Sequence, residues 1–378
     1  MALNVLSSEE QLFKETIQKF AQEAVQPHVT TMDETAQLHP DIIPQLFSLG
    51  LMGLEVAEKF NGSASSFFMT CLAIEELSKV DPSVALLVDV QNTLVNNIFL
   101  KFASPTQQAQ YLPQLATQRL GAFCLTETHS GSDAFALQTK AIKEGDSWIL
   151  EGKKIFITNA LEASIYIVFA NIDPSKGYKG ITAFIVEKDN PGLKIGKKEN
   201  KLGIRASSTC EVILDKAKVK NSAMLGELGK GYKIAIETLN EGRIGIAAQL
   251  LGMTQGAFKH AVKYAYDREQ FGQRLNHFQA IQFQLAEIEC KIESMRCLVY
   301  NAAKMKDQGL PFTREAAIAK YMCSKLAEES ISSALEVFGG YGFIKEFPLE
   351  KFYRDVKIGK LYEGTSHMQL ATIFKLIN

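Results

Sequence analysis

One carboxylate near the end of the chain has a setting that could support acid–base chemistry. The stretch LYEGTSHMQ, residues 361–369, places Glu363 between Tyr362 and Gly364, directly before a predicted helix start at Thr365–Ser366. Glu363 is either a surface cap for that helix or, if it is buried, a general base. Burial against an apolar group would raise its pKa and make it a stronger base, whereas the helix start would lower that pKa. These residues alone leave both roles open.

Two further stretches have compositions suited to ligand binding. CLTETHSGSDAFA, residues 124–136, follows a β-type run with hydroxyls, glycine and an acid. Small residues and exposed amides let a backbone approach a planar or phosphorylated ligand closely. EVFGGYGFIKEFPLEKFYRD, residues 336–355, contains glycines that allow a tight fold against a cofactor. On composition alone the first stretch is more typical of a polar loop between domains, and the second of a helix that ends at glycine.

Composition excludes several other classes of protein. The 378 residues are 46% apolar and 22% charged with a formal net charge of -1, which argues against a nucleic-acid binder. Scattered histidines predict no metal site, and six cysteines without a C-x-x-C pair predict free thiols in a reducing compartment. The chain contains no G-x-G-x-x-G, P-loop or G-x-S-x-G motif. Its apolar runs are too short to span a bilayer, and its first residues lack the features of a signal or transit peptide.

Three successive domains are predicted to position these stretches. Residues 1–119 show helical patterns, beginning with a helix capped at Ser7–Ser8. Residues 120–224 carry short β-rich runs with turn signals, including a predicted turn at Glu151–Gly152, as in a small sandwich or barrel. Residues 225–378 return to long helical patterns joined by short loops, which indicates an antiparallel helical bundle. The predicted fold class is mainly α with a β middle domain.

As ordered strings, the two ligand-type stretches resemble the two signatures of the acyl-CoA dehydrogenase family. Residues 124–136 match a small residue, Leu, Thr, Glu, two variable positions, a small residue and Gly-Ser-Asp. Residues 336–355 match an acid, Gly-Gly-x-Gly and a fixed run to a basic and an acidic residue. The order of the signatures and the three domains are similar to the family over essentially the whole chain. ENKLGIRASSTC, GYKGIT, LNEGRIGIAAQ and KIGKLYEGTS most resemble its short/branched-chain members.

The resemblance implies a role for Glu363. Family members remove two hydrogens from an acyl-CoA thioester to give a trans-2-enoyl-CoA: a glutamate takes the α-proton, and FAD takes the β-hydrogen as hydride at N5. Glu363 falls on the common position of this base. A second position that carries the base in some members is Gly242 here, with Glu241 one place off. The resemblance therefore favours Glu363 as the catalytic residue.

The resemblance also implies two sets of binding residues. The cofactor-binding set is Phe123, Leu125, Thr126, Ser132, Phe156, Ile157, Thr158, Arg268, Gln279, Glu336, Val337, Phe338, Gly339, Gly340, Thr365, Ser366 and His367. The substrate-binding set is Ser132, Tyr178, Tyr232, Asn240, Glu241, Gly242 and Arg243. Within the first set, Arg268 and Gln279 are expected to hold FAD phosphates of a neighbouring subunit. The sequence departs from the family at Phe156, where tryptophan is frequent, and at Thr128–His129, where proline and a small residue are common.

The partners follow from the same resemblance. We expect an acyl-CoA substrate, an electron-transferring flavoprotein as electron partner and a homotetramer, with no nucleic acid and no membrane span. A eukaryotic chain would belong in the mitochondrial matrix, and a bacterial one in the cytoplasm. Two alternatives keep the fold: the same site used as a 2-methyl-branched enoyl-CoA reductase, and a catalytically inactive scaffold protein. Intact Glu363 and both signatures disfavour the scaffold.

Overall fold

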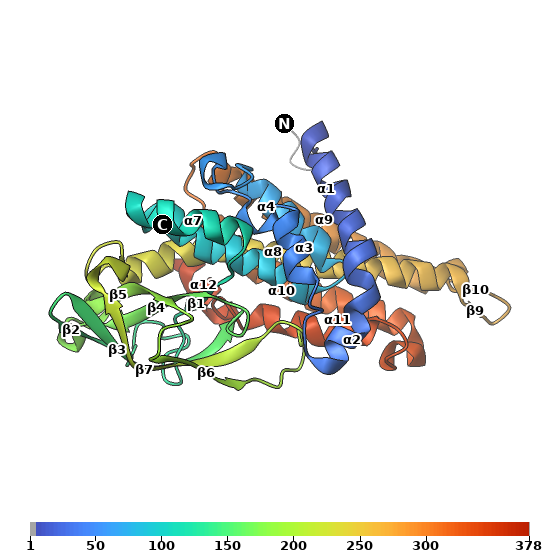
Figure 1. Ribbon diagram of the computed structural model, residues 1–378. Helices are drawn as coiled ribbons and strands as arrows, with labels where there is room; N and C mark the ends of the chain where they lie inside the picture. The colour runs from blue at the N-terminus through green and yellow to red at the C-terminus, as the bar shows by residue number, and fades with distance from the viewer. Residues whose placement is uncertain (1–4, 378) are drawn as a thin grey trace.

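Helices form the first part of the chain in the computed structural model, which describes residues 5–377. They are α1 (Ser8–Phe20), α2 (Val29–Thr35), α3 (Ile42–Ser48), α4 (Phe67–Ser78), α5 (Pro82–Asp89), α6 (Asn97–Phe102) and α7 (Pro105–Thr117). Ser7 caps α1 through a reciprocal pair of bonds with Glu10, as its position before two glutamates predicts. Figure 1 shows these helices stacked along the longer helices that end the chain.

A single continuous helix, Pro82–Phe102, runs through the centre of this group. It comprises α5, a π-helical turn at Val90–Asn96 and α6. By length and composition it could cross a membrane, but 94% of its most apolar window is buried inside the protein. Two amides in the π-helical turn fix it to the segment before α4: Asn92 Nδ2 donates to Leu51 O at 2.8 Å, and Asn96 Nδ2 donates to Met52 O at 2.8 Å. These bonds set which side of the helix faces the bundle.

The middle of the chain forms one eight-stranded sheet in the order β6-β7-β3-β2-β4-β5-β8, with β1 pairing in parallel with β4. The strands are β1 (Gly121–Cys124), β2 (Lys140–Glu144), β3 (Ser147–Thr158), β4 (Ile165–Asn171), β5 (Ile181–Glu187), β6 (Leu193–Lys198), β7 (Thr209–Lys220) and β8 (Met224–Leu225). The predicted turn at Glu151–Gly152 is wrong. β3 continues through these residues because β7 pairs along its length, and Gly152 occupies a bulge instead.

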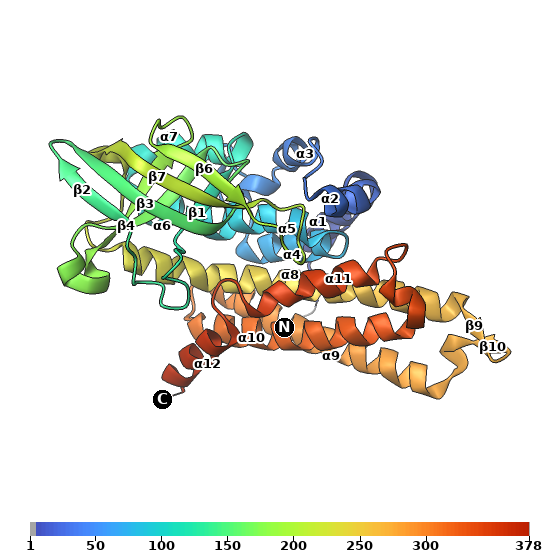
Figure 2. The same cartoon turned by 90° about the horizontal axis from the view of Figure 1, so that it is seen from below.

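The C-terminal part is a helical bundle built on α8 (Gly231–Asp267). A short hairpin, β9 (Glu269–Gln270) and β10 (Gln273–Arg274), leads to α9 (Gln279–Asp307), and α10 (Thr313–Val337), α11 (Leu349–Val356) and α12 (Ser366–Lys375) follow. Figure 2 shows the sheet and the N-terminal helices on one side of α8, and α9 and α10 on the other. This helix therefore has neighbours from all three parts of the chain.

Two hydrophobic cores stabilise the arrangement. One is shared by the N-terminal helices and the bundle, and the other lies within the sheet. Ion pairs and backbone contacts join the parts: Arg354 Nη2 in α11 donates to Asp33 Oδ2 in α2 at 2.7 Å. Gly203, in the loop between β6 and β7, lies so close to α11 that a Cβ there would be 2.5 Å from Arg354 O. The loops of the sheet are thus held against the bundle.

Candidate active site

Glu363 lies in a short turn between α11 and α12. Its φ is 50° and that of Gly364 is 94°, so two successive residues adopt left-handed backbone conformations. The helix starts at Ser366 with Thr365 as N-cap, as predicted, and no side chain donates or accepts at that cap. Glu363 Oε2 is buried and has no hydrogen-bond partner. The carboxylate is therefore not a helix cap.

The space for this carboxylate exists because α8 has a glycine beside it. A Cβ on Gly242 would lie 2.2 Å from Glu363 Oε2 and 3.0 Å from Leu94 Cδ2. Any side chain at Gly242 would displace one of these two neighbours. Burial raises the pKa of Glu363 to about 7, opposed by the positive charges of Lys320 and Arg243. A carboxyl with such a pKa can accept a proton near neutral pH.

Glu241, the neighbouring acid, has a different environment. It is 1% exposed, and its Oε1 accepts from Lys101 Nζ. Its Oε2 lies 3.7 Å from Lys306 Nζ. Two lysines therefore neutralise Glu241, and its carboxylate contributes to an ion-pair cluster. This arrangement favours Glu363 over Glu241 as the base.

Two titratable residues of the site were missed by sequence reasoning. Asp89 in α5 is fully buried, accepts from Thr93 Oγ1 at 3.0 Å, and would lie 2.0 Å from a Cβ on Gly245. Burial, followed by the charge of Glu363, raises its pKa well above the usual range. Lys320 in α10 is also fully buried, and its Nζ donates to Gly364 O at 2.6 Å. The available signal was a lone charge in each of two apolar runs, SVALLVDV and AAIAKYM.

The first signature stretch is held in place by a buried ion pair. Lys154 Nζ in β3 donates to Glu127 Oε1 at 2.6 Å and to Leu125 O at 3.0 Å. The other carboxylate oxygen of Glu127 accepts from the Gln138 backbone N–H at 2.7 Å. Both ends of the loop between β1 and β2 are thus tied to one carboxylate. The loop has a fixed shape although it lacks regular secondary structure.

The predicted flavin-side residues lie around this loop and the neighbouring strand. Phe123 and Thr158 are partly exposed, and the carbonyl of Thr126, which is also partly exposed, accepts from the Ile155 N–H at 2.9 Å. Phe156 has a φ of 56° in the bulge of β3, and its side chain is 60% exposed. Ile157 is buried in the core of the sheet. An open aromatic face beside a fixed polar loop can accept a planar ring system.

Two pairs of the predicted substrate-side residues are in contact, Tyr178 with Tyr232 and Asn240 with Arg243. The rings of Tyr178 and Tyr232 meet edge to face, with centroids 4.8 Å apart. Phe135, three residues after the exposed Ser132, lies 6.4 Å from Tyr232 by ring centroids. Further along α8 than Tyr232, Arg243 Nη1 donates to Asn240 Oδ1 at 2.9 Å. Arg243 Nε is buried and has no hydrogen-bond partner. The chain therefore presents an unused buried donor close to the unused acceptor of Glu363.

A second group of predicted cofactor residues lies elsewhere. The Arg268 guanidinium is 5.3 Å from the ring centroid of Tyr341, in the loop that follows α10 and includes Gly339 and Gly340. Gln279 and Glu336 are exposed, whereas Val337 and Phe338 pack in the core. From Lys320 near Glu363 to the end of α10 is 337 − 320 = 17 residues, or about 25 Å. Within one chain these residues therefore lie far from Glu363. Thr365, Ser366 and His367 adjoin it.

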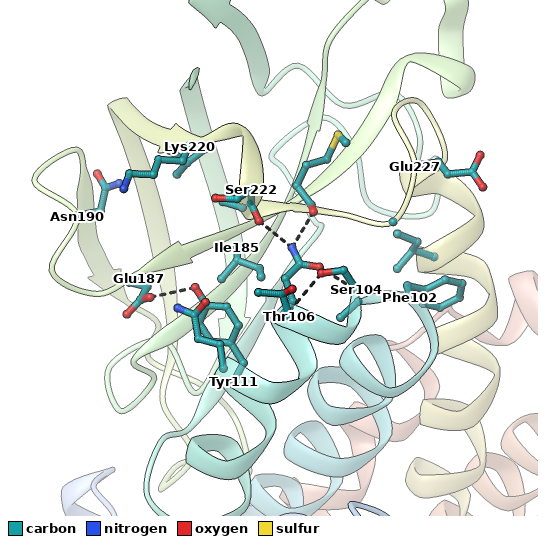
Figure 3. A pocket seen from close by; sticks show the side chains of 18 of the residues that line it. Phe102, Ser104, Thr106, Tyr111, Ile185, Glu187, Asn190, Lys220, Ser222 and Glu227 are labelled. Carbon is teal, nitrogen blue, oxygen red and sulfur yellow. Dashed lines mark hydrogen bonds between the residues drawn. The ribbon is translucent and has the colours of Figure 1, made fainter. Parts of the chain in front are cut away.

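A groove of about 1480 Å³ is also separate from Glu363. Figure 3 shows it between α7, β5, β8 and the start of α8. Its walls are joined by hydrogen bonds, including one of 3.0 Å from Tyr111 Oη to Glu187 Oε1. Gln107 Nε2 donates to the Ser222 and Met224 carbonyls at 2.9 and 2.8 Å. This groove is a polar seam between domains, and its size does not make it the reaction site.

Comparisons with known proteins find matches in all three parts of the chain. Family models described as acyl-CoA dehydrogenase N-terminal, middle and C-terminal domains match residues 7–119, 122–217 and 229–377. The chain belongs to the acyl-CoA dehydrogenase family. It is therefore an oxidoreductase that depends on FAD, as its relatives and structural neighbours are.

Two relatives show where in the family this acyl-CoA dehydrogenase lies. It is 55% identical to a "Probable short/branched chain specific acyl-CoA dehydrogenase" of Dictyostelium discoideum, over 99% of this chain and 91% of the relative. It is 48% identical to the mitochondrial short/branched chain specific acyl-CoA dehydrogenase of Rattus norvegicus, over 100% and 87%. The predicted resemblance to short/branched-chain members is confirmed.

Two solved structures have the same fold. Butyryl-CoA dehydrogenase of Megasphaera elsdenii superposes with a TM-score of 0.97 at 43% identity, covering 99% of both chains. A chain from a structure described as the electron transferring flavoprotein of Acidaminococcus fermentans gives 0.98 at 40% identity, covering 100% of this chain and 99% of that one. The predicted fold class, helical with a β middle domain, is confirmed.

The residues present fit FAD. The side chain of Phe156 is open to a planar ring, and the loop at Thr126 is fixed by bonds within the chain. A buried acceptor, Glu363 Oε2, and a buried donor, Arg243 Nε, have no hydrogen-bond partner within the chain and can bind a ligand. Buried polar groups without partners are rare in proteins, and a bound ligand would satisfy them.

Proposed function

We propose that this enzyme dehydrogenates short or 2-methyl-branched acyl-CoA thioesters to trans-2-enoyl-CoA, with Glu363 as the base that takes the α-proton. The observation that carries the proposal is the buried, unpartnered Oε2 of Glu363 beside Gly242. A general base needs a lone pair that no hydrogen bond within the protein occupies, and a pKa near the working pH. The raised pKa of Glu363, about 7, meets the second requirement.

In the proposed function, the surrounding residues bind and orient FAD and the acyl-CoA substrate. In this proposal Phe123, Leu125, Thr126, Phe156 and Thr158 hold FAD, which when bound supplies the acceptor for the β-hydrogen as hydride. Tyr178, Tyr232 and Ser132 lie along the path of the CoA arm, and Arg243 Nε offers a donor to a thioester or pantetheine carbonyl. Leu94 lies on the same side of Gly242 as the Glu363 carboxylate, so an apolar side chain borders the proposed base.

Substitution of Glu363 tests the base assignment. Glu363→Gln should retain FAD and lower kcat by about 10²- to 10⁴-fold with a dye acceptor, since loss of a general base typically costs that much. Glu23→Gln, a change at an exposed glutamate of the N-terminal helices, is the matched control and should leave kcat unchanged. Near-normal turnover by Glu363→Gln would refute the assignment and direct attention to Glu241.

The substrate range is the second part of the proposal. A branch next to the α-carbon needs width beside the base, and the identity to short/branched chain specific relatives supports such a substrate range. We expect the highest kcat/KM with 2-methylbutyryl-CoA, with butyryl-, isobutyryl- and hexanoyl-CoA within a modest factor and palmitoyl-CoA poor. Each methylene changes binding by only about 1–3 kcal/mol, so discrimination should be graded. A clear preference for palmitoyl-CoA or isovaleryl-CoA would overturn this range.

The third part concerns assembly. Since Arg268 and the loop after α10 lie about 25 Å along the bundle from the Glu363 region, they suit the FAD of another copy better than their own. We propose a homotetramer in which neighbouring subunits complete each flavin site, and an electron-transferring flavoprotein that receives the electrons. Arg268→Ala should release FAD more readily than the wild type on gel filtration. A monomer in light scattering that retains FAD tightly would contradict the proposal.

A further inference from the structure

Lys320 is a buried cation. The binding of FAD or substrate does not explain why a cation lies at this position. Its side chain is fully buried on α10, and its ammonium donates to Gly364 O at 2.6 Å. Burying a lysine is costly, and burial lowers the pKa of Lys320 to about 8. An alanine-rich helix such as α10 would pack at lower cost with an apolar residue at this position. The retained charge therefore needs a function.

The backbone at Glu363 supplies one reason for the lysine. Glu363 has a φ of 50°, a conformation that costs a residue with a side chain about 1–3 kcal/mol unless its surroundings impose it. Two donors impose it here through the carbonyl of Gly364. Lys320 Nζ provides a charged hydrogen bond, and Gln369 Nε2, itself fully buried, provides a neutral one of 2.9 Å. The direction of the Glu363 side chain depends on this carbonyl.

The charges around Glu363 supply a second reason. Four titratable groups from four segments face its carboxylate: Lys320 from α10, Arg243 from α8, Asp89 from α5 and Tyr362 in the same turn. Burial raises the pKa of Asp89 and the pKa of Tyr362 well above their usual ranges, and neither group can supply a positive charge to Glu363. The cations that oppose the burial of Glu363 are Lys320 first and Arg243 second.

We infer that Lys320 is the positioning residue of this active site, holding the Glu363–Gly364 turn through the Gly364 carbonyl and keeping the Glu363 carboxylate ionised through its charge. The inference rests on the proposed role of Glu363 as base. Lys320 itself acts through Glu363 and transfers no proton to substrate. The effect of the hydrogen bond can be separated from that of the charge. Gln369 also donates to the Gly364 carbonyl but carries no charge.

The test compares the pH dependence of kcat/KM for butyryl-CoA in Lys320→Met, Lys320→Arg and Gln369→Leu holoenzymes. Removing a cation close to a carboxylate raises the carboxyl pKa by about 1–3 units. The acid limb of the pH profile of kcat/KM should therefore move to higher pH in Lys320→Met. At a pH on that limb, kcat/KM should fall by at least about tenfold. Lys320→Arg should leave the limb in place. Gln369→Leu should lower kcat without moving the limb, since it removes only a neutral donor.

A second measurement separates this inference from the assignment of the base. Infrared difference spectra of wild type against Glu363→Gln, recorded through a pH titration, report the Glu363 carboxyl whether or not it reacts with substrate. In a Lys320→Met background this carboxyl should titrate at higher pH. If Glu363→Gln retains turnover, the base assignment fails while the infrared result still tests Lys320. If Lys320→Met leaves both the carboxyl titration and the acid limb unmoved, the inference is overturned.

Should Lys320→Met not fold, Lys320→Gln replaces it. Its amide can still donate to a carbonyl, so it keeps a neutral hydrogen bond in place of the charged one. The same displacement of the acid limb is expected. An unmoved limb in Lys320→Gln contradicts the inference in the same way.

Discussion

Replacing Glu363 with glutamine should make the protein more stable at alkaline pH, even though it removes the proposed base. Burial raises the pKa of this carboxyl from 4.5 to about 7. A group whose pKa is higher in the folded state contributes stability that is fully present below its unfolded pKa. That contribution is lost as the pH rises through the folded pKa. The wild type should therefore lose stability between about pH 4.5 and pH 7, and Glu363→Gln should not.

The size of the effect follows from the two pKa values. Their difference is 7 − 4.5 = 2.5, which at about 1.36 kcal/mol per pKa unit gives roughly 3.4 kcal/mol as an upper limit. With about 2.1 cal/mol/K of unfolding entropy per residue, a 378-residue chain gains roughly 4 °C in Tm for that free energy. Any penalty for the glutamine amide in the slot is independent of pH. It shifts the whole curve of stability against pH and does not change its shape.

Thermal unfolding of both proteins, followed by circular dichroism at a fixed heating rate, measures this difference. The Tm of Glu363→Gln minus that of the wild type should rise between about pH 5 and pH 8.5 by a few degrees. Glu23→Gln should show no such rise, because that side chain is exposed. A difference in Tm that stays constant with pH would show that the Glu363 carboxyl is not desolvated in the folded protein.

Two further predictions concern the supports of the site. Gly242→Ala places a Cβ 2.2 Å from Glu363 Oε2, so the carboxylate must move. The kcat of this variant should fall by about 10²-fold while its helical circular dichroism signal is retained. An unchanged kcat would show that the carboxylate acts from another position. Lys154→Met leaves Glu127 buried without its cation and should lower the free energy of unfolding by about 3–5 kcal/mol in urea titrations. The double variant Lys154→Met/Glu127→Gln should recover much of that loss, and equal losses in the single and double variants would show that the ion pair is not the cause.

The sequence predicted the elements of the site better than the contacts between them. The helix start at Ser366 and the long helix Gly231–Asp267 follow from local signals, namely Thr365 as cap and continuous apolar periodicity. Glu363 was found because it falls on the position where the resembling family commonly carries its base. Asp89 and Lys320 were not found, since their importance arises only when α5, α8 and α10 bring them beside Glu363.

Resemblance also names positions without stating which atoms face a ligand. Ile157, Val337 and Phe338 were expected to contact FAD from the resemblance, yet their side chains pack in the protein core. The bulge at Gly152 in β3 was predicted to be a turn, because a glycine after a glutamate is compatible with either. Pairing with the distant strand β7 decides between them. Packing partners of this kind are not encoded in any local pattern.

The π-helical turn at Val90–Asn96 makes the wall of the acyl slot sensitive to chain length as well as to residue type. A π-helical turn holds one more residue than the α-helical turn that would replace it, so loss of one residue there would convert it to ordinary α-helix and leave the helix that follows nearly in phase. The side chains within the turn, including Leu94 beside Gly242, would be placed differently, while Asp89 before the turn would stay in place. A single-codon deletion can thus reshape the slot without substituting a side chain. Length variation in this helix offers related enzymes a route to new acyl groups that leaves Glu363 untouched.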